Sequence, residues 1–109
     1  MYFSVSVILR DGRSDYDGAV MCWHGNDYYP VCADTFRTTE ASVVCRQLFG
    51  ARFLGRTIPA VASRTQTGPT FLKLSCRGGE SQVSDCTYEY ASTLERCYYG
   101  DASIECYQT

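Results

Sequence analysis

Residues 38–50 read TTEASVVCRQLFG and carry the one strong helix signal in the chain. Four apolar side chains recur at positions i, i+3, i+4 and i+7, which places them on one stripe of a helix: Ala41, Val44, Cys45 and Leu48. Thr38 or Thr39 can cap the N-terminus, because a hydroxyl accepts from the first free N–H groups. Glu40 suits the positive end of the helix dipole, and Gly50 can end the helix.

The rest of the sequence gives short β-like segments on both sides of this helix. They are bounded by Gly, Asp or Pro and lie at residues 5–9, 19–23, 30–32, 71–76 and 102–106. A Thr- and Ser-rich stretch at 60–68, between two prolines, reads as a surface loop. The 109 residues therefore predict a single compact α+β domain with a small curved antiparallel sheet, one main helix and long loops.

Seven cysteines are many for a chain of this length. Their successive spacings are 10, 13, 31, 10, 11 and 9 residues, so the sequence has no close pair of the kind that zinc sites use. The spacing favours a disulfide framework, and hence an oxidising, extracellular compartment. The odd count leaves one cysteine either free or bonded outside the chain.

Charge is segregated along the chain although the net charge is only −2. Residues 41–79 contain six basic side chains and no acid, whereas the segments on either side are acidic. The net charge disfavours nucleic acid as a partner, and no apolar run is long enough to insert into a membrane. The basic segment predicts a local field that attracts anions, unless folding interleaves it with the acidic segments.

Four stretches together resemble the scavenger receptor cysteine-rich domain family. They cover most of the chain in the family's order and are ASVVCRQL at 41–48, TGPTFL at 67–72, CRGGESQVSDC at 76–86 and DASIEC at 101–106. Each stretch alone is weak evidence for the family, but the four together in this order are specific to it. Residues 1–10 do not read as a signal peptide, so we expect a mature module excised from a larger extracellular protein.

The resemblance implies a disulfide pairing that spacing alone leaves open among 15 connectivities. The implied bonds are Cys32–Cys97, Cys45–Cys106 and Cys76–Cys86. Members with eight cysteines have a further bond at the positions of Tyr16 and Ala51, so this chain resembles the six-cysteine group. Cys22 is left over, and it is either a buried free thiol or the site of an interchain disulfide.

The resemblance also implies a calcium site in many members, formed by two aspartates after the second framework cysteine and a glutamate near the last one. Here these positions hold Ala33 and Asp34, and Gly100 followed by Asp101. Because calcium needs several oxygen ligands, Asp34 and Asp101 form a degenerate site, and we expect no cofactor.

The resemblance implies adhesion or ligand capture rather than catalysis. His24 is the only histidine, and no nucleophile motif accompanies it. We expect a recognition module that binds a protein or a polyanionic glycan through four arginines: Arg52, Arg56, Arg64 and Arg77. The alternatives are a structural assembly module packed against neighbouring domains of a matrix or polymer, and an accessory domain of an ectodomain enzyme.

Overall fold

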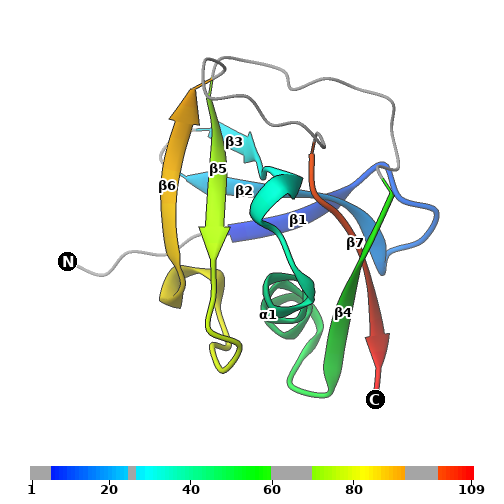
Figure 1. The fold of residues 1–109 in the computed structure, drawn as a ribbon. Coiled ribbons are helices and arrows are strands. Elements are labelled where there is room, and N and C mark those ends of the chain that lie inside the picture. Colours follow the sequence, from blue (N-terminus) through cyan, green and yellow to red (C-terminus); the bar gives the residue numbers. More distant parts are fainter. Residues whose placement is uncertain (1–5, 25–26, 60–69, 93–100) are drawn as a thin grey trace.

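A computed structural model of the chain describes residues 6–24, 27–59, 70–92 and 101–109. The side chains at 24, 27, 70–72 and 90–92 lie outside this description. Two antiparallel sheets and one α-helix make up the described part, as expected for the fold class (Figure 1). No helix in this part is long and apolar enough to cross a bilayer.

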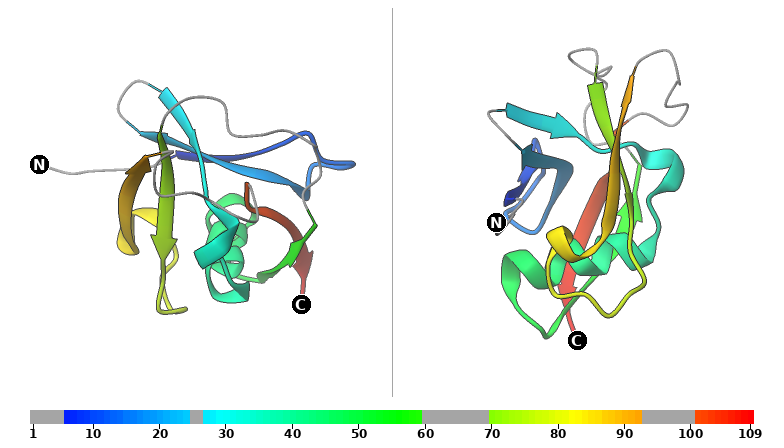
Figure 2. Two further views of the ribbon diagram at one scale, coloured as in Figure 1. Left: turned by 45° about the horizontal axis from the view of Figure 1, so that its top comes forward. Right: turned by 90° about the vertical axis from the view of Figure 1, so that its left-hand side faces the viewer.

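The larger sheet has five strands, in the order β1-β2-β7-β4 with β3 paired to β2. Its strands are β1 (Ser6–Arg10), β2 (Asp17–His24), β3 (Asp27–Pro30), β4 (Phe53–Ile58) and β7 (Ser103–Gln108). The smaller sheet pairs β5 (Thr70–Ser75) with β6 (Thr87–Ser92). Two 3₁₀ turns, η1 (Ala33–Thr35) and η2 (Val83–Asp85), complete the elements. In Figures 1 and 2, α1 (Thr38–Phe49) lies between the β5–β6 ladder and the β4–β7 pair.

The helix begins one residue earlier than the threonines suggested. Its N-cap is Arg37, and Glu40 reaches back to accept a hydrogen bond of 2.8 Å from the Arg37 backbone N–H. This bond is the glutamate half of a capping box, and it places the first helical residue at Thr38. The prediction that Thr38 or Thr39 caps the helix was therefore wrong, whereas Gly50 does end it, with φ at +116°.

The apolar stripe of α1 packs against β4 and β7. The Cys45–Cys106 disulfide joins the helix to β7, with 5.5 Å between the two Cα atoms. On β4, a Cβ atom at Gly55 would lie 2.5 Å from the carbonyl oxygen of Ala41 and 2.6 Å from the Cys45 sulfur. Only a residue without a side chain fits this gap, so Gly55 sets how closely the sheet approaches the helix.

One hydrophobic core fills the space between α1 and the two sheets. Its fully buried members come from β2, α1, β5, η2 and β7, and include Val20, Cys22, Val44, Leu74, Val83 and Ile104. Disulfides and this core share the same interior, so the cysteines tie together elements that apolar packing already holds.

Two strands were missed by the sequence prediction, namely β4 and β6. The strand expected at 30–32 lies earlier, because β3 ends at Pro30 and Cys32 makes only an isolated bridge to Asp101. The strands expected at 5–9, 19–23, 71–76 and 102–106 each overlap an observed strand. The loop predicted at 60–68 lies outside the described residues.

Candidate functional site

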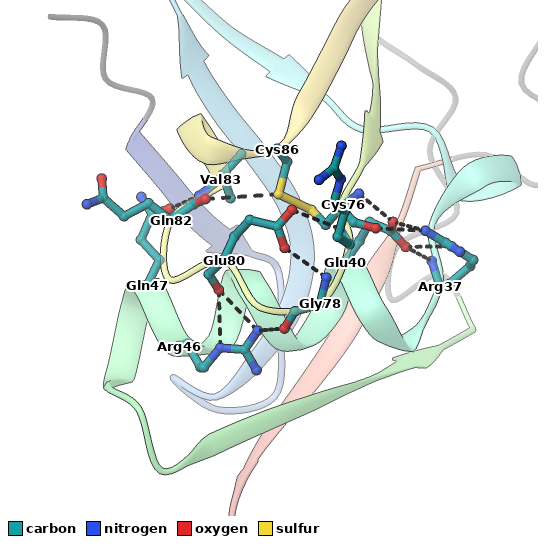
Figure 3. The surroundings of a disulfide bond; sticks show 11 residues. Arg37, Glu40, Arg46, Gln47, Cys76, Gly78, Glu80, Gln82, Val83 and Cys86 are labelled. Atoms are coloured by element: carbon teal, nitrogen blue, oxygen red, sulfur yellow. Dashed lines mark hydrogen bonds and ion pairs between the residues drawn. A yellow bond between two sulfur atoms is a disulfide. The ribbon is translucent and has the colours of Figure 1, made fainter.

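A disulfide-closed loop lies against one face of α1. Cys76 and Cys86 are bonded, with 4.7 Å between their Cα atoms, and they enclose the turn that follows β5 (Figure 3). This bond and the Cys45–Cys106 bond are two of the three that the family resemblance implied. The two sulfurs and the Glu80 carboxylate lie within 4.8 Å of one another, but sulfurs in a disulfide do not offer thiolates to a metal.

Three helix side chains hold this loop by its backbone. Glu40 accepts from the Cys76 N–H at 2.8 Å, and Gln47 accepts from the Val83 N–H at 2.7 Å. Arg46 donates to the carbonyl oxygens of Gly78 at 2.6 Å and Glu80 at 3.1 Å. Figure 3 shows these contacts spread along the helix from its first turn to its last. We name Glu40, Arg46 and Gln47 the helix clamp.

Glu40 is the most buried charged group of the clamp. Its side chain is fully buried, and it accepts from the backbone N–H and the guanidinium of Arg37 as well as from Cys76. Burial alone raises the pKa of Glu40, but the hydrogen bonds from Arg37 and Cys76 outweigh it, and the net pKa lies below the ordinary value. Glu40 is therefore ionised at neutral pH, and it joins the start of the helix to the start of the loop.

Within the loop, Glu80 folds the backbone back on itself. Its carboxylate accepts from the N–H groups of Arg77 and Gly78, each at 2.8 Å. These backbone hydrogen bonds, led by that from Arg77, lower the pKa of Glu80. The turn is thus held by the Cys76–Cys86 disulfide and by the hydrogen bonds to Glu80, and the side chain of Arg77 on this turn is exposed.

The four arginines predicted to bind anions have different surroundings. Arg56 forms an ion pair with Glu105, with 2.8 Å from its Nε to Oε1, so its charge is largely offset. Strand β7 places this acid directly opposite Arg56, so a ligand has to compete with Glu105 for the guanidinium, and ligand binding by Arg56 stays a prediction. Arg64 lies outside the described residues. Arg52 and Arg77 are exposed, and their guanidinium groups donate no hydrogen bond within the described part of the chain.

The segments that carry Arg52 and Arg77 lie at the same end of the molecule. The turn between α1 and β4 and the loop after β5 both form the lower edge in Figures 1 and 2. The turn is fixed by Thr109, whose N–H and hydroxyl donate to the carbonyl oxygen of Arg52 at 2.9 and 3.0 Å. Two exposed arginines therefore belong to well-held backbone segments at one end of the domain, and the charge of Arg77 also interacts with the Glu80 carboxylate.

The two aspartates of the degenerate calcium site differ in their exposure to solvent. Asp101 is buried and lines a pocket with Ala33, Phe36 and Ser103, whereas Asp34 is exposed and is not among the described residues that line this pocket. Ala33, which has only a methyl group, stands where the family resemblance implies an aspartate. That this site is degenerate and holds no calcium ion stays a prediction.

The remaining cysteines differ in state. Cys22 is free and fully buried on β2, and burial raises its pKa to about 12. This placement corresponds to the buried-thiol alternative, since a fully buried sulfur cannot reach another chain. Cys32 is disulfide-bonded, and its implied partner Cys97 lies outside the described residues. The His24 side chain also lies outside them.

An aromatic cluster connects the turn before β2 to the end of α1. Tyr16 lies 4.8 Å from Phe49 and 5.8 Å from Phe53, measured between ring centroids, and Phe49 and Phe53 are 5.3 Å apart. Tyr16 marks one end of the extra bond in members with eight cysteines. This cluster and the helix clamp were missed from the sequence, although 41–48 contains Arg46 and Gln47.

Comparison with known proteins agrees with this geometry. The family model described as "Scavenger receptor cysteine-rich domain" matches residues 10–107. Among solved structures, the third such domain of murine neurotrypsin superposes with a TM-score of 0.74 at 24% identity, covering 97% of this chain and all of that one. The dimeric form of the mouse MARCO domain gives a TM-score of 0.66 at 21% identity, covering 98% and 92%.

Curated relatives are much longer proteins. A scavenger receptor cysteine-rich domain superfamily protein of Patiria pectinifera is 31% identical over 99 residues, 90% of this chain and 9% of that protein. The egg peptide speract receptor of Strongylocentrotus purpuratus is 30% identical over 103 residues, and lysyl oxidase homolog 3A of Danio rerio is 30% identical over 100. Each match covers 90% of this chain, but only 19% and 13% of those two proteins. The match over residues 10–107, together with this fold, shows that the chain belongs to the scavenger receptor cysteine-rich domain family.

Proposed function

We propose that this domain is a non-catalytic recognition module of a larger extracellular protein, and that it binds a polyanionic ligand through Arg52 and Arg77. The observation that carries the proposal is that both arginines are exposed on backbone segments at one end of the domain, and that their guanidinium groups donate no hydrogen bond in the described part. A guanidinium presents a planar fork that pairs bidentately with sulfate, phosphate or carboxylate groups.

The helix clamp supports this role because it fixes the loop that carries Arg77. A ligand that binds a pre-ordered backbone does not have to supply the free energy of ordering it. The Cys76–Cys86 bond, the Glu80 carboxylate and the three clamp side chains all hold the loop before any ligand arrives. The segment 41–79 contains no acid, and Glu80, which follows it, is the acid whose charge interacts with Arg77.

The test is the binding of the domain to immobilised heparin, measured by surface plasmon resonance at several salt concentrations. We expect affinity to fall steeply with salt, because exposed charges are screened over about 8 Å at physiological ionic strength. The double variant Arg52→Ala/Arg77→Ala should bind at least about tenfold more weakly, since one charged hydrogen bond contributes about 1.5 kcal/mol or more.

Arg13→Ala is the matched control, because Arg13 is also exposed but lies in the β1–β2 turn. The control should bind heparin as the parent domain does. Equal losses in the double variant and the control would show that net charge alone governs binding, and the proposal would then be wrong.

A second role is favoured by the relatives that are lysyl oxidase homologs. In this role the module is an accessory domain that positions an ectodomain enzyme, and the reaction belongs to another part of the parent protein. The sequence on either side of residues 1–109 in the parent protein decides between the roles. Tandem copies of this domain favour recognition, fibrous neighbours favour an assembly role, and a neighbouring catalytic domain favours the accessory role.

A further inference from the structure

The outer face of strands β1, β2 and β3 carries an aromatic pair directed away from the core. The register pairs Trp23 with both Ser6 and Tyr28, while the neighbouring pair Val7 and Cys22 is buried in the core. Because side chains alternate along a strand, Trp23 and Tyr28 lie on the opposite face. Their rings are 4.8 Å apart at an interplanar angle of 65°, and Trp23 is 38% exposed.

Arg10 belongs to the same face. It lies an even number of positions from Ser6 along β1, so its side chain projects on the outer side. Its guanidinium carbon lies 5.8 Å from the centroid of the Tyr28 ring, a cation–π contact that orients the group without neutralising it. Neither this guanidinium nor the Trp23 indole N–H donates to an acceptor in the part of the chain that the structure describes.

The size of this patch argues against a protein as the occupant. A standard protein interface buries about 800 Å² on each partner. On this face Trp23 is the single large hydrophobic side chain that is more than a third exposed among the described residues, and Met21 between the ends of the face is buried. One aromatic ring, one indole N–H and one guanidinium fork make a small site of mixed polarity.

We propose that this outer face binds an acidic saccharide, with a sugar ring packed on Trp23 and a carboxylate or sulfate group paired with Arg10. The C–H bonds on one side of a pyranose ring form an apolar surface that fits the electron-rich face of an indole. A hydroxyl of the same sugar can accept from the Trp23 N–H, and an anionic substituent can accept the bidentate fork of Arg10. The site deepens the proposed recognition role but uses none of its residues, because it stands apart from Arg52 and Arg77.

Trp23 is the only tryptophan in the chain, so its fluorescence reports on this site alone. The experiment titrates the domain with a hyaluronan octasaccharide, which carries carboxylates, with a heparin octasaccharide, which also carries sulfates, and with neutral cellohexaose. We expect a saturable change in tryptophan emission with one or both acidic saccharides, and an affinity for cellohexaose at least tenfold weaker. Comparing the affinities for the hyaluronan and heparin octasaccharides shows whether the site prefers a carboxylate or a sulfate group.

Variants separate this site from the arginine pair at the other end. Arg10→Gln should weaken the acidic saccharide at least tenfold, and Arg10→Lys, which keeps the charge but not the fork, should weaken it severalfold. Arg13→Gln is the matched control and should bind normally, as should Arg52→Ala/Arg77→Ala in this fluorescence assay. If the double variant loses heparin on the sensor surface while saccharides leave Trp23 emission unchanged, the inference is wrong and the proposed function stands. Equal affinities for acidic and neutral saccharides, or an equal response to a tryptophan-free glutamate octapeptide, would also overturn it.

Discussion

Replacing Glu40 with Ala should destabilise the domain by about 2 kcal/mol, because the change leaves a buried backbone N–H without its acceptor and removes a hydrogen bond at the helix start. The carboxylate is fully buried, and it accepts from Arg37 and from the N–H of Cys76. Its loss removes the acceptor of the Arg37 backbone N–H at the helix start and leaves the Cys76 N–H without its acceptor. Arg37 can turn to solvent, because 60% of its side chain is already exposed, so its charge is not trapped in the core.

Urea unfolding followed by circular dichroism, with disulfides intact, measures this loss. Glu89→Ala is the matched control, because Glu89 is an exposed acid on β6, and it should change stability by less than about 0.5 kcal/mol. Amide exchange adds a local readout, since the Cys76 N–H should exchange faster in Glu40→Ala than in the control. A loss below about 1 kcal/mol, with unchanged protection at Cys76, would show that the disulfide alone holds the loop and that the helix clamp is incidental.

Three further outcomes follow from the same structure. The folded state lowers the pKa of Glu40, so the stabilisation by this carboxylate is complete above its unfolded-state pKa near 4.5 and is lost as the pH falls further. Below pH 4.5, the urea midpoint should therefore fall more steeply with pH in the parent domain than in Glu40→Ala. Cys22, buried with a pKa of about 12, should resist iodoacetamide at pH 8 in the native domain and react after unfolding in urea, and rapid native labelling would contradict its burial. Gly55→Ala should cost about 2 kcal/mol, because the added methyl group meets the Ala41 carbonyl and the Cys45 sulfur, and a neutral effect on the thermal midpoint would show that β4 shifts freely.

The sequence predicted α1 well because its signal is local. The stripe of apolar residues and Gly50 both act within a few residues of themselves. The helix start was misassigned because a threonine hydroxyl was expected to cap the helix, whereas the Glu40 carboxylate accepts from the backbone N–H of Arg37, a residue that is not a usual N-cap. β4 was missed for a similar reason, since Gly55 weakens any strand pattern and becomes understandable only when the helix lies against it.

The candidate site also has features that the sequence predicts and features that only the fold shows. The basic segment at 41–79 was visible as composition, but the sequence could not show which charges remain available. Arg46 is used by the backbone of Gly78 and Glu80, and Arg56 is paired across a ladder with Glu105. Both partners are remote in sequence, so only the fold distinguishes Arg52 and Arg77 from them. The pairing of the cysteines likewise came from the family resemblance, because spacing leaves it open.

The aromatic cluster of Tyr16, Phe49 and Phe53 bears on the order in which the chain folds. Members with eight cysteines close this junction with a covalent bond, and such bonds form in seconds to hours under the control of an oxidant. Apolar rings need no oxidant and associate during collapse, which takes up to about 100 microseconds for a chain of about 100 residues. In this chain the turn before β2 can therefore reach the end of α1 before the thiols are oxidised. That contact brings β2 alongside β7, because the Cys106 N–H on β7 donates to the carbonyl oxygen of Tyr16. We therefore expect this junction to bring Cys45 and Cys106 near each other before their disulfide bond forms.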